Sequence, residues 1–162
     1  MYFEPLSESH SLALFDFELI NQKFFEEVIA PRNDDFYSIA GVQKHITSQV
    51  TKTDVRAFVL VDNSQIIARA NIRNIGNDGS AEIGYRVAET TTGSGVGSMS
   101  VARLVEEAVA LNLRQLTAYV MGNNPASEKV LVKNGFQLNL CLPRGFQHQG
   151  TTINGFKYQR LV

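Results

Sequence analysis

The sequence predicts an α/β fold, because strand-like and helix-like patterns alternate along the chain. Two observations carry this prediction. A strand-like alternation over residues 82–87 runs into three glycines and then into an amphipathic helix, and a strand, a capped helix and a further strand follow it. The chain has 162 residues and no repeat, linker or low-complexity tract, so we expect one domain over residues 1–162.

The first fifty residues are predicted to be helical and irregular. Ser9 or Ser11 is expected to cap a helix, which continues after a bend over residues 23–30. Its apolar residues on one side are Leu12, Phe15, Leu19 and Ile20. Residues 31–34 predict a turn, after which Asp35 is expected to cap a helix bearing Ile39, Val42, Ile46 and Val50.

Three strands are expected next. The near-continuous apolar run at residues 55–61 predicts a buried strand, and residues 62–64 predict a hairpin turn. The second strand sorts its residues by face, with Ile66, Ala68, Ala70 and Ile72 on one face and Arg69, Asn71 and Arg73 on the other. A turn at residues 77–80 leads into the third strand, which carries Glu82, Gly84 and Arg86 on one side.

The glycine loop after this strand predicts a phosphate site. Gly93, Gly95 and Gly97 can adopt left-handed or strained dihedrals, so the backbone N–H groups of about residues 94–98 can converge on an anion. The following helix adds unpaired donors and about half a positive charge. A dinucleotide fingerprint needs glycine where Ser98 stands, and a P-loop needs a Gly-Lys-Ser/Thr that the loop lacks. The alternative is a flexible connection without a ligand.

The chain beyond the loop continues the alternation. Apolar residues from Val96 to Leu111 recur at steps of three and four and predict a helix of about four turns. A strand at residues 116–121 precedes a helix with Asn124 as N-cap and a left-handed cap at its C-terminal end, at residues 134–135. Residues 136–142 predict a strand in which Cys141 is expected to be buried.

This order of motifs resembles the acetyl-CoA-dependent N-acetyltransferases of the GNAT superfamily, and most of all the RimJ/RimL-like branch that acetylates ribosomal-protein N-termini. Gly95 and Gly97 match the glycines of the superfamily loop, whereas Thr92 stands where a long polar residue is usual. The resemblance implies a mixed, mostly antiparallel sheet of about seven strands, flanked by helices and splayed at the acetyl-CoA site. It also implies an acyltransferase in which an amine directly attacks the acetyl thioester.

The resemblance further implies the residues that hold acetyl-CoA. These are Tyr85, Arg86 and Val87 of the strand, the loop residues Thr92, Gly93, Ser94, Gly95, Val96, Gly97 and Ser98, and Asn124 and Ser127 of the later helix. Ser127 would be the general acid that protonates the leaving thiolate, and Asn124 a positioning contact. The alternative role for both is helix capping.

A general base is harder to assign. Where the branch often has acidic residues, the sequence has Asn139, Phe146 and Asn154. Glu82 remains as a catalytic candidate that at most orders a water, and its alternative is a solvated strand residue. We expect Arg69, Asn71, Arg73 and His148 on the acceptor side. The alternative for His148 is a surface loop, which is favoured over a role in the site, and each arginine could equally be an ordinary exposed residue. His10, His45 and His148 form no ligand pattern, so no metal is expected.

Composition excludes several classes of protein. A net charge of -1 gives no electrostatic footprint for nucleic acid, and no apolar run reaches the 18 or so residues of a membrane span. The N-terminal residues do not resemble a signal peptide, and a single cysteine allows no internal disulfide, so a cytoplasmic protein is expected.

The expected partner is an amine, either a ribosomal-protein N-terminus or a small amine, and a homodimer stays open. The alternatives are a non-catalytic acyl-CoA sensor and a nucleotide-binding module.

Overall fold

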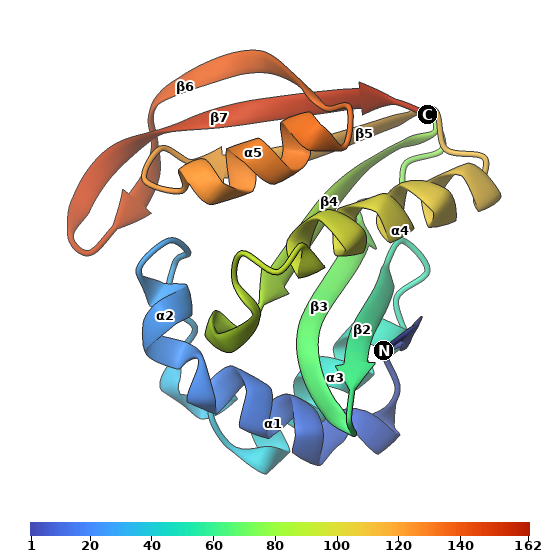
Figure 1. Ribbon diagram of the computed structural model, residues 1–162, viewed down its shortest axis with the longest axis vertical. Coiled ribbons are helices and arrows are strands. Elements are labelled where there is room, and N and C mark those ends of the chain that lie inside the picture. Colours follow the sequence, from blue (N-terminus) through green and yellow to red (C-terminus); the bar gives the residue numbers. More distant parts are fainter.

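The computed structural model describes residues 1–162 and contains one seven-stranded sheet with helices on both faces (Figure 1). The strands are β1 (Tyr2–Pro5), β2 (Arg56–Asp62), β3 (Gln65–Arg73), β4 (Ser80–Val87), β5 (Gln115–Met121), β6 (Gln137–His148) and β7 (Thr151–Leu161). The α-helices are α1 (Ser11–Ile20), α2 (Gln22–Glu26), α3 (Ile39–Val50), α4 (Val96–Ala110) and α5 (Pro125–Lys133). Single 3-10 turns are η1 (Glu8–His10), η2 (Asp34–Phe36) and η3 (Glu89–Thr91).

The sheet has the order β1-β2-β3-β4-β5-β7-β6. Only β4 and β5 pair in parallel, and every other pair is antiparallel. The prediction of a mixed, mostly antiparallel seven-stranded sheet is therefore confirmed. The long α4 crossover follows from that single parallel pair, because parallel neighbours need a crossover connection.

Two separate cores lie on the two faces of the sheet. Helices α4 and α5 cover one face, where Ile72, Leu104 and Leu131 are fully buried. Helices α1 and α3 cover the other, where Leu14 and Ile46 are fully buried. Strand β3 serves both cores because its side chains alternate: Ala70 and Ile72 lie in the core under α4, and Arg69 faces α1. Ile66, which the sequence places on the same face as Ala70 and Ile72, lies instead in the core under α1 and α3, beside a shift in the β2–β3 register.

The predicted buried side of α1 is wrong. Leu12, Leu19 and Ile20 are 64%, 45% and 77% exposed, and Phe15 is only half-buried. The helix instead buries Leu14, Phe17 and Glu18 against the sheet. Hydrophobicity alone cannot identify this side, because its central residue is a carboxylate whose partners come from distant strands.

The predicted cap of α3 is also wrong. Ser38 is the N-cap, and its Oγ accepts a hydrogen bond from the Gly41 N–H at 3.0 Å, whereas Asp35 lies in η2. A Cβ on Gly41 would lie 2.0 Å from the Asp35 carbonyl oxygen, so this turn packs too tightly on α3 for any other residue. Of the four apolar residues expected on this helix, Val42 and Ile46 are buried, whereas Ile39 and Val50 at its two ends are exposed.

The cysteine prediction fails for a topological reason. Cys141 is exposed, and its neighbours Leu138 and Leu140 are 51% and 52% exposed. Strand β6 is the last strand of the sheet, so it pairs only with β7 and lies beyond the core under α4 and α5. Alternation in the sequence therefore identifies this strand but not its burial.

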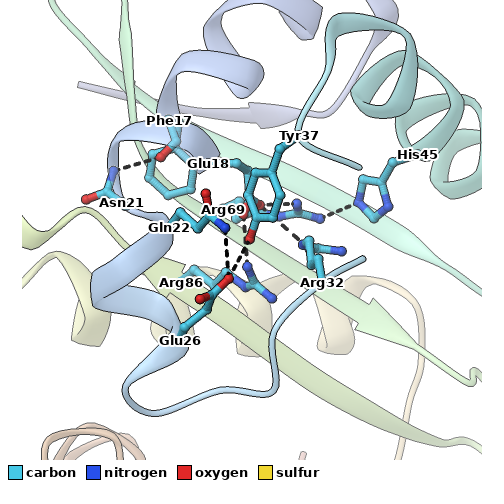
Figure 2. A network of polar contacts seen from close by, with 10 residues as sticks. All are labelled: Phe17, Glu18, Asn21, Gln22, Glu26, Arg32, Tyr37, His45, Arg69 and Arg86. Carbon is cyan, nitrogen blue, oxygen red and sulfur yellow. Dashed lines mark hydrogen bonds and ion pairs between the residues drawn. The ribbon is translucent and has the colours of Figure 1, made fainter. Parts of the chain in front are cut away.

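A charged cluster ties α1 to the sheet (Figure 2). Glu18 is 1% exposed, and its carboxylate pairs with Arg69 at 2.5 Å, Arg86 at 2.9 Å and Arg32 at 3.7 Å. Burial by itself would raise the pKa of Glu18, but the three guanidinium groups outweigh it and hold the pKa below its usual value. The cluster therefore contains one carboxylate and three cations.

His45 completes the cluster without adding charge. Burial, followed by the nearby Arg69 and Arg32, lowers the pKa of His45 to about 3. Its ring is therefore neutral at neutral pH, and Nε2 accepts a hydrogen bond from Arg69 at 2.7 Å. The ring proton must then sit on Nδ1.

We predict that Glu18→Gln lowers the free energy of unfolding by about 3 kcal/mol, because it leaves three buried cations without their counter-charge. The matched control is Glu106→Gln, which removes an exposed carboxylate paired with Arg103 within α4. That change is expected to cost less than about 1 kcal/mol. Urea unfolding measures both, and equal losses would show that the buried cluster does not stabilise the fold.

Candidate functional site

A gap in the sheet forms the candidate site. Strands β4 and β5 pair only where residues 80–82 meet residues 115–117, and beyond that point they diverge. A cavity of about 480 Å³ lies between the diverging ends, lined by residues 83–86 of β4 and 118–121 of β5. The splay that the resemblance implies is therefore present.

The cavity runs from one face of the sheet to the other. Tyr85, Asn124 and Ser127 line it on the α5 side. Arg69 and Arg86, which contact α1, line it from the opposite side. Two molecules that approach from opposite faces can therefore meet inside the gap.

The backbone of β4 offers hydrogen-bond donors to this gap. The Ala88 N–H donates to the Ile67 carbonyl at 2.9 Å, so it points toward β3. Successive N–H groups of a strand point to opposite sides, and the β3–β4 register has no irregularity. The N–H groups of Tyr85 and Val87 therefore point away from β3, where β5 has already diverged.

A serine and a tyrosine meet at the edge of the cavity. The Ser127 Oγ lies 2.9 Å from the Tyr85 hydroxyl. Burial raises the pKa of Tyr85 to about 12, although its bond to Ser127 acts in the opposite direction. The phenol therefore stays protonated at neutral pH. The sequence does not single out the Tyr85 hydroxyl, although strand alternation places this side chain on the face opposite Arg86.

Asn124 caps α5, as the sequence predicts. Its Oδ1 accepts a hydrogen bond from the Ser127 N–H at 3.1 Å, and Asn124 also lines the cavity. The cap fixes the first turn of α5 and with it the position of Ser127. Capping and a role in the site are therefore compatible for these two residues.

The glycine loop has the geometry of an anion site. Gly93 and Gly95 have φ of +81° and +89°, and a Cβ on either would meet no atom within 4 Å. The N–H groups of Gly95, Val96, Gly97 and Ser98 donate to no protein acceptor. These four donors at the start of α4 fit the pyrophosphate of a coenzyme.

The other loop residues contribute differently from expectation. The Ser94 N–H is already used, because it donates to the Thr91 carbonyl at 3.3 Å. The Thr92 hydroxyl turns back to the Ala88 carbonyl at 3.4 Å. A Cβ on Gly97 would lie 3.4 Å from the Tyr85 ring, which is an ordinary contact, so Gly97 packs against Tyr85 without requiring glycine. The Ser98 Oγ accepts a hydrogen bond from Asn134 at 3.1 Å, which leaves its N–H available.

Arginines line the wall of the cavity that faces α1, on the side opposite Ser127. Arg69, Arg73 and Arg86 line the cavity, together with Arg32, which the sequence analysis placed only in a turn. Asn71 also lines it, and its buried Oδ1 has no hydrogen-bond partner. No signal in the sequence identifies Arg32, because the chain brings it there from a loop between α2 and η2.

Glu82, His148, Val87 and the loop residues 92–98 lie outside the lining of the cavity. Glu82 sits where β4 still pairs with β5, and its Oε2 accepts a hydrogen bond from Arg73 at 3.3 Å. His148 lies at the end of β6, and its Nε2 lies 3.0 Å from the Glu26 carbonyl oxygen. Each of these two side chains is therefore already engaged by another residue. Phe146, at a position where the branch often has an acid, does line the cavity.

No group of three or more His, Cys, Asp or Glu side chains is arranged to hold a metal ion. None of the helices has both the length and the apolar character needed to cross a membrane.

Known proteins share this architecture. A family model described as an acetyltransferase (GNAT) domain matches residues 1–137. A probable N-acetyltransferase of Bacillus subtilis (strain 168), YjcK, is 28% identical over 163 residues, which cover 96% of this chain and 87% of that protein. Ribosomal-protein-S5-alanine acetyltransferase from Vibrio fischeri has a TM-score of 0.92 at 18% identity, with 98% of this chain and 91% of that chain covered. Mycobacterium smegmatis RimJ, solved in complex with CoA-disulfide, has a TM-score of 0.89 at 20% identity, with 99% and 81% covered.

We predict that Gly95→Asp weakens CoA binding more than about tenfold, because it places a carboxylate where the pyrophosphate would lie. Gly150→Asp is the matched control. Gly150 has φ of +78° and the same open surroundings, but it lies in the β6–β7 turn. Calorimetry with CoA measures both variants, and equal affinities would show that the glycine loop binds no phosphate.

Proposed function

The chain belongs to the GNAT acetyltransferase family and is an acetyl-CoA-dependent N-acetyltransferase, and we propose that its acceptor is a primary α-amine, such as the N-terminus of a peptide or protein. Membership of an enzyme family favours this function over an acyl-CoA sensor or a nucleotide-binding module. The observation that carries the proposal is the lining of the cavity, which contains no aspartate, glutamate, lysine or histidine.

Without a base in the lining, an acceptor has to arrive as the neutral amine. An α-amine has a pKa of about 7.7–8.0 and a lysine side chain about 10.4. At pH 7 the neutral form therefore costs about 1 kcal/mol for the α-amine and 4–5 kcal/mol for the lysine. Glu82 at most orders a water that takes the proton, because its carboxylate pairs with Arg73 and does not itself line the cavity.

The residues of the chain divide the remaining work. Bound acetyl-CoA supplies an acetyl thioester, whose carbonyl carbon the amine attacks directly. The loop donors at residues 95–98 hold the pyrophosphate. The N–H groups of Tyr85 and Val87 donate to the carbonyl oxygen as its negative charge grows, which is the most effective kind of stabilisation that such a site offers.

Ser127 is the proposed proton donor to the leaving sulfur. Its hydroxyl is held by the α5 cap and by the Tyr85 hydroxyl at 2.9 Å. The protonated phenol can donate to Ser127 Oγ while the serine proton moves to the sulfur. The RimJ and ribosomal-protein-S5-alanine acetyltransferase neighbours support a protein amine as the acceptor, since the second is named for an alanine of ribosomal protein S5.

We predict that Ser127→Ala lowers kcat about 10²-fold and changes the affinity for CoA little. Tyr85→Phe should lower kcat less, by about tenfold, because Ser127 can still donate its proton but loses the hydrogen bond with the Tyr85 hydroxyl. Tyr158→Phe is the matched control: the Tyr158 hydroxyl also contacts α5, where it donates to Glu128 at 2.7 Å, but it does not line the cavity. Unchanged turnover in Ser127→Ala, with a stability loss of about 1 kcal/mol, would leave Ser127 with a capping role only.

The acceptor is tested with two matched peptides, one with a free α-amine and one with a blocked N-terminus and a single lysine. At pH 7 we predict that kcat/KM for the α-amine is higher by about 300-fold, the difference in neutral fraction. Both values should rise about tenfold per pH unit below the pKa of each amine. A preference for the lysine peptide at pH 7 that disappears in Glu82→Gln would refute the proposal and identify Glu82 as an obligatory base.

A further inference from the structure

We propose that the acceptor carries an anionic group close to its amine, and that Arg32 and Arg86 bind this group. The proposal rests on the proposed function and narrows its substrate class. Four arginines line the cavity, and no acidic residue does. This wall lies on the side of the sheet opposite Ser127, from which an acceptor would approach.

The acidic residues near these arginines neutralise only part of their charge. Glu18 is shared by Arg69, Arg86 and Arg32. Glu82 pairs with Arg73 at 3.3 Å. Two carboxylates therefore face four guanidinium groups, which leaves about two positive charges.

No other group forms an ion pair with these four arginines. His45 contacts Arg69 as a neutral ring. Glu26 directs its Oε1 to Gln22 and Tyr37, at 3.0 and 3.5 Å, and makes no ion pair with an arginine. The excess positive charge therefore faces the cavity.

Two of the arginines also have donors to spare. Arg32 makes no hydrogen bond, its buried Nε has no partner, and its nearest carboxylate oxygen is 3.7 Å away. Arg86 uses one of its five N–H donors, on Glu18. Their side chains are 22% and 15% exposed, so both groups reach the cavity while most of each is shielded from water.

Packing holds these two guanidinium groups in place. Arg32 stacks over the Phe36 ring at 4.1 Å, and Arg86 lies over the Phe25 ring at 5.3 Å. A planar, fixed guanidinium matches the geometry of a carboxylate or a phosphate. An unpaired, partly buried donor is costly, and an anion that accepts from it removes that cost.

The same charge selects against cationic acceptors. A polyamine or a lysine-rich segment would bring further positive charge to a wall that is already positive. The wall also disfavours the ammonium form of the acceptor, which lowers the pKa of the amine and increases its neutral fraction. An acceptor that places its anionic group on the arginines and its amine in the gap avoids the repulsion and also has a larger neutral fraction of amine.

The test compares three peptide amides that share one α-amine, Ala-Asp-Ala, Ala-Asn-Ala and Ala-Lys-Ala. We predict that kcat/KM for the aspartate peptide exceeds that for the asparagine peptide at least about tenfold, with the lysine peptide lowest, and that added salt reduces the difference. Alanine and alaninamide form a second pair, which tells whether the anion belongs to a side chain or to a small amino acid. Equal rates within both pairs would overturn the proposal.

Variants link the preference to the wall. Arg32→Gln should reduce the aspartate-to-asparagine ratio to below about threefold, and Arg32→Lys should keep part of it. Arg103→Gln changes an exposed arginine of α4 and should leave the aspartate-to-asparagine ratio unchanged. An unchanged ratio in Arg32→Gln, in protein that circular dichroism shows to be folded, would exclude Arg32 as the anion site.

One outcome separates this proposal from the proposed function. If no α-amine is acetylated, the proposed function fails. The affinities of the acetylated peptides then decide whether the anion site exists. The acetylated Ala-Asp-Ala amide should then still bind the CoA complex at least about tenfold more tightly than its asparagine counterpart in calorimetry. Equal binding of the two acetylated peptides would refute the anion site as well.

Discussion

The early end of the β4–β5 pairing is the constraint on which the site depends. The two strands share three residue pairs and then separate. Their separation opens the cavity, leaves the Tyr85 and Val87 N–H groups without a strand partner, and lets α5 bring Ser127 beside Tyr85. A sheet paired along its full length would satisfy its own backbone groups and have no room for a thioester. Here the unpaired backbone becomes available for catalysis.

The buried Glu18 cluster is the counterpart of this gap on the other face of the sheet. It attaches α1 to β3 and β4 through charges, at the end of the core formed by α1 and α3. A single carboxylate for three arginines is an unbalanced arrangement, and it is tolerated because Arg32 and Arg86 also reach the cavity. The interaction that attaches the helix therefore also involves two of the arginines that line the cavity. Under the proposal made above, fold stability and substrate selection would share the same residues.

The sequence predicted those parts of the molecule whose signals are short-range. The start of α4 at the glycine loop, the Asn124 cap of α5 and the left-handed Gly135 at its end follow from dihedral preferences and local hydrogen bonds. The alternation of β3 and β4 also assigned Arg69 and Arg86 to one face correctly. The family resemblance implied a mixed, mostly antiparallel sheet of about seven strands, which is confirmed, whereas the order of the strands comes from the structure alone.

What the sequence could not predict depends on contacts between distant residues. The inward side of α1 contains Glu18, and a helix that buries a carboxylate has the wrong hydrophobic pattern until its arginine partners are known. Cys141 alternates like a core residue but lies on an edge strand. Arg32 comes from an irregular loop, and only the packing of that loop beside β3 and β4 brings it to the cavity.

The central claim is that acetyl-CoA lies in the gap between β4 and β5 with its phosphates on the glycine loop. Backbone amide hydrogen exchange, measured with and without CoA, tests it most directly. The account predicts slower exchange at residues 95–98 and at Tyr85 and Val87, the donors that have no acceptor within the protein. Unchanged exchange at these amides under conditions in which CoA is bound would contradict it.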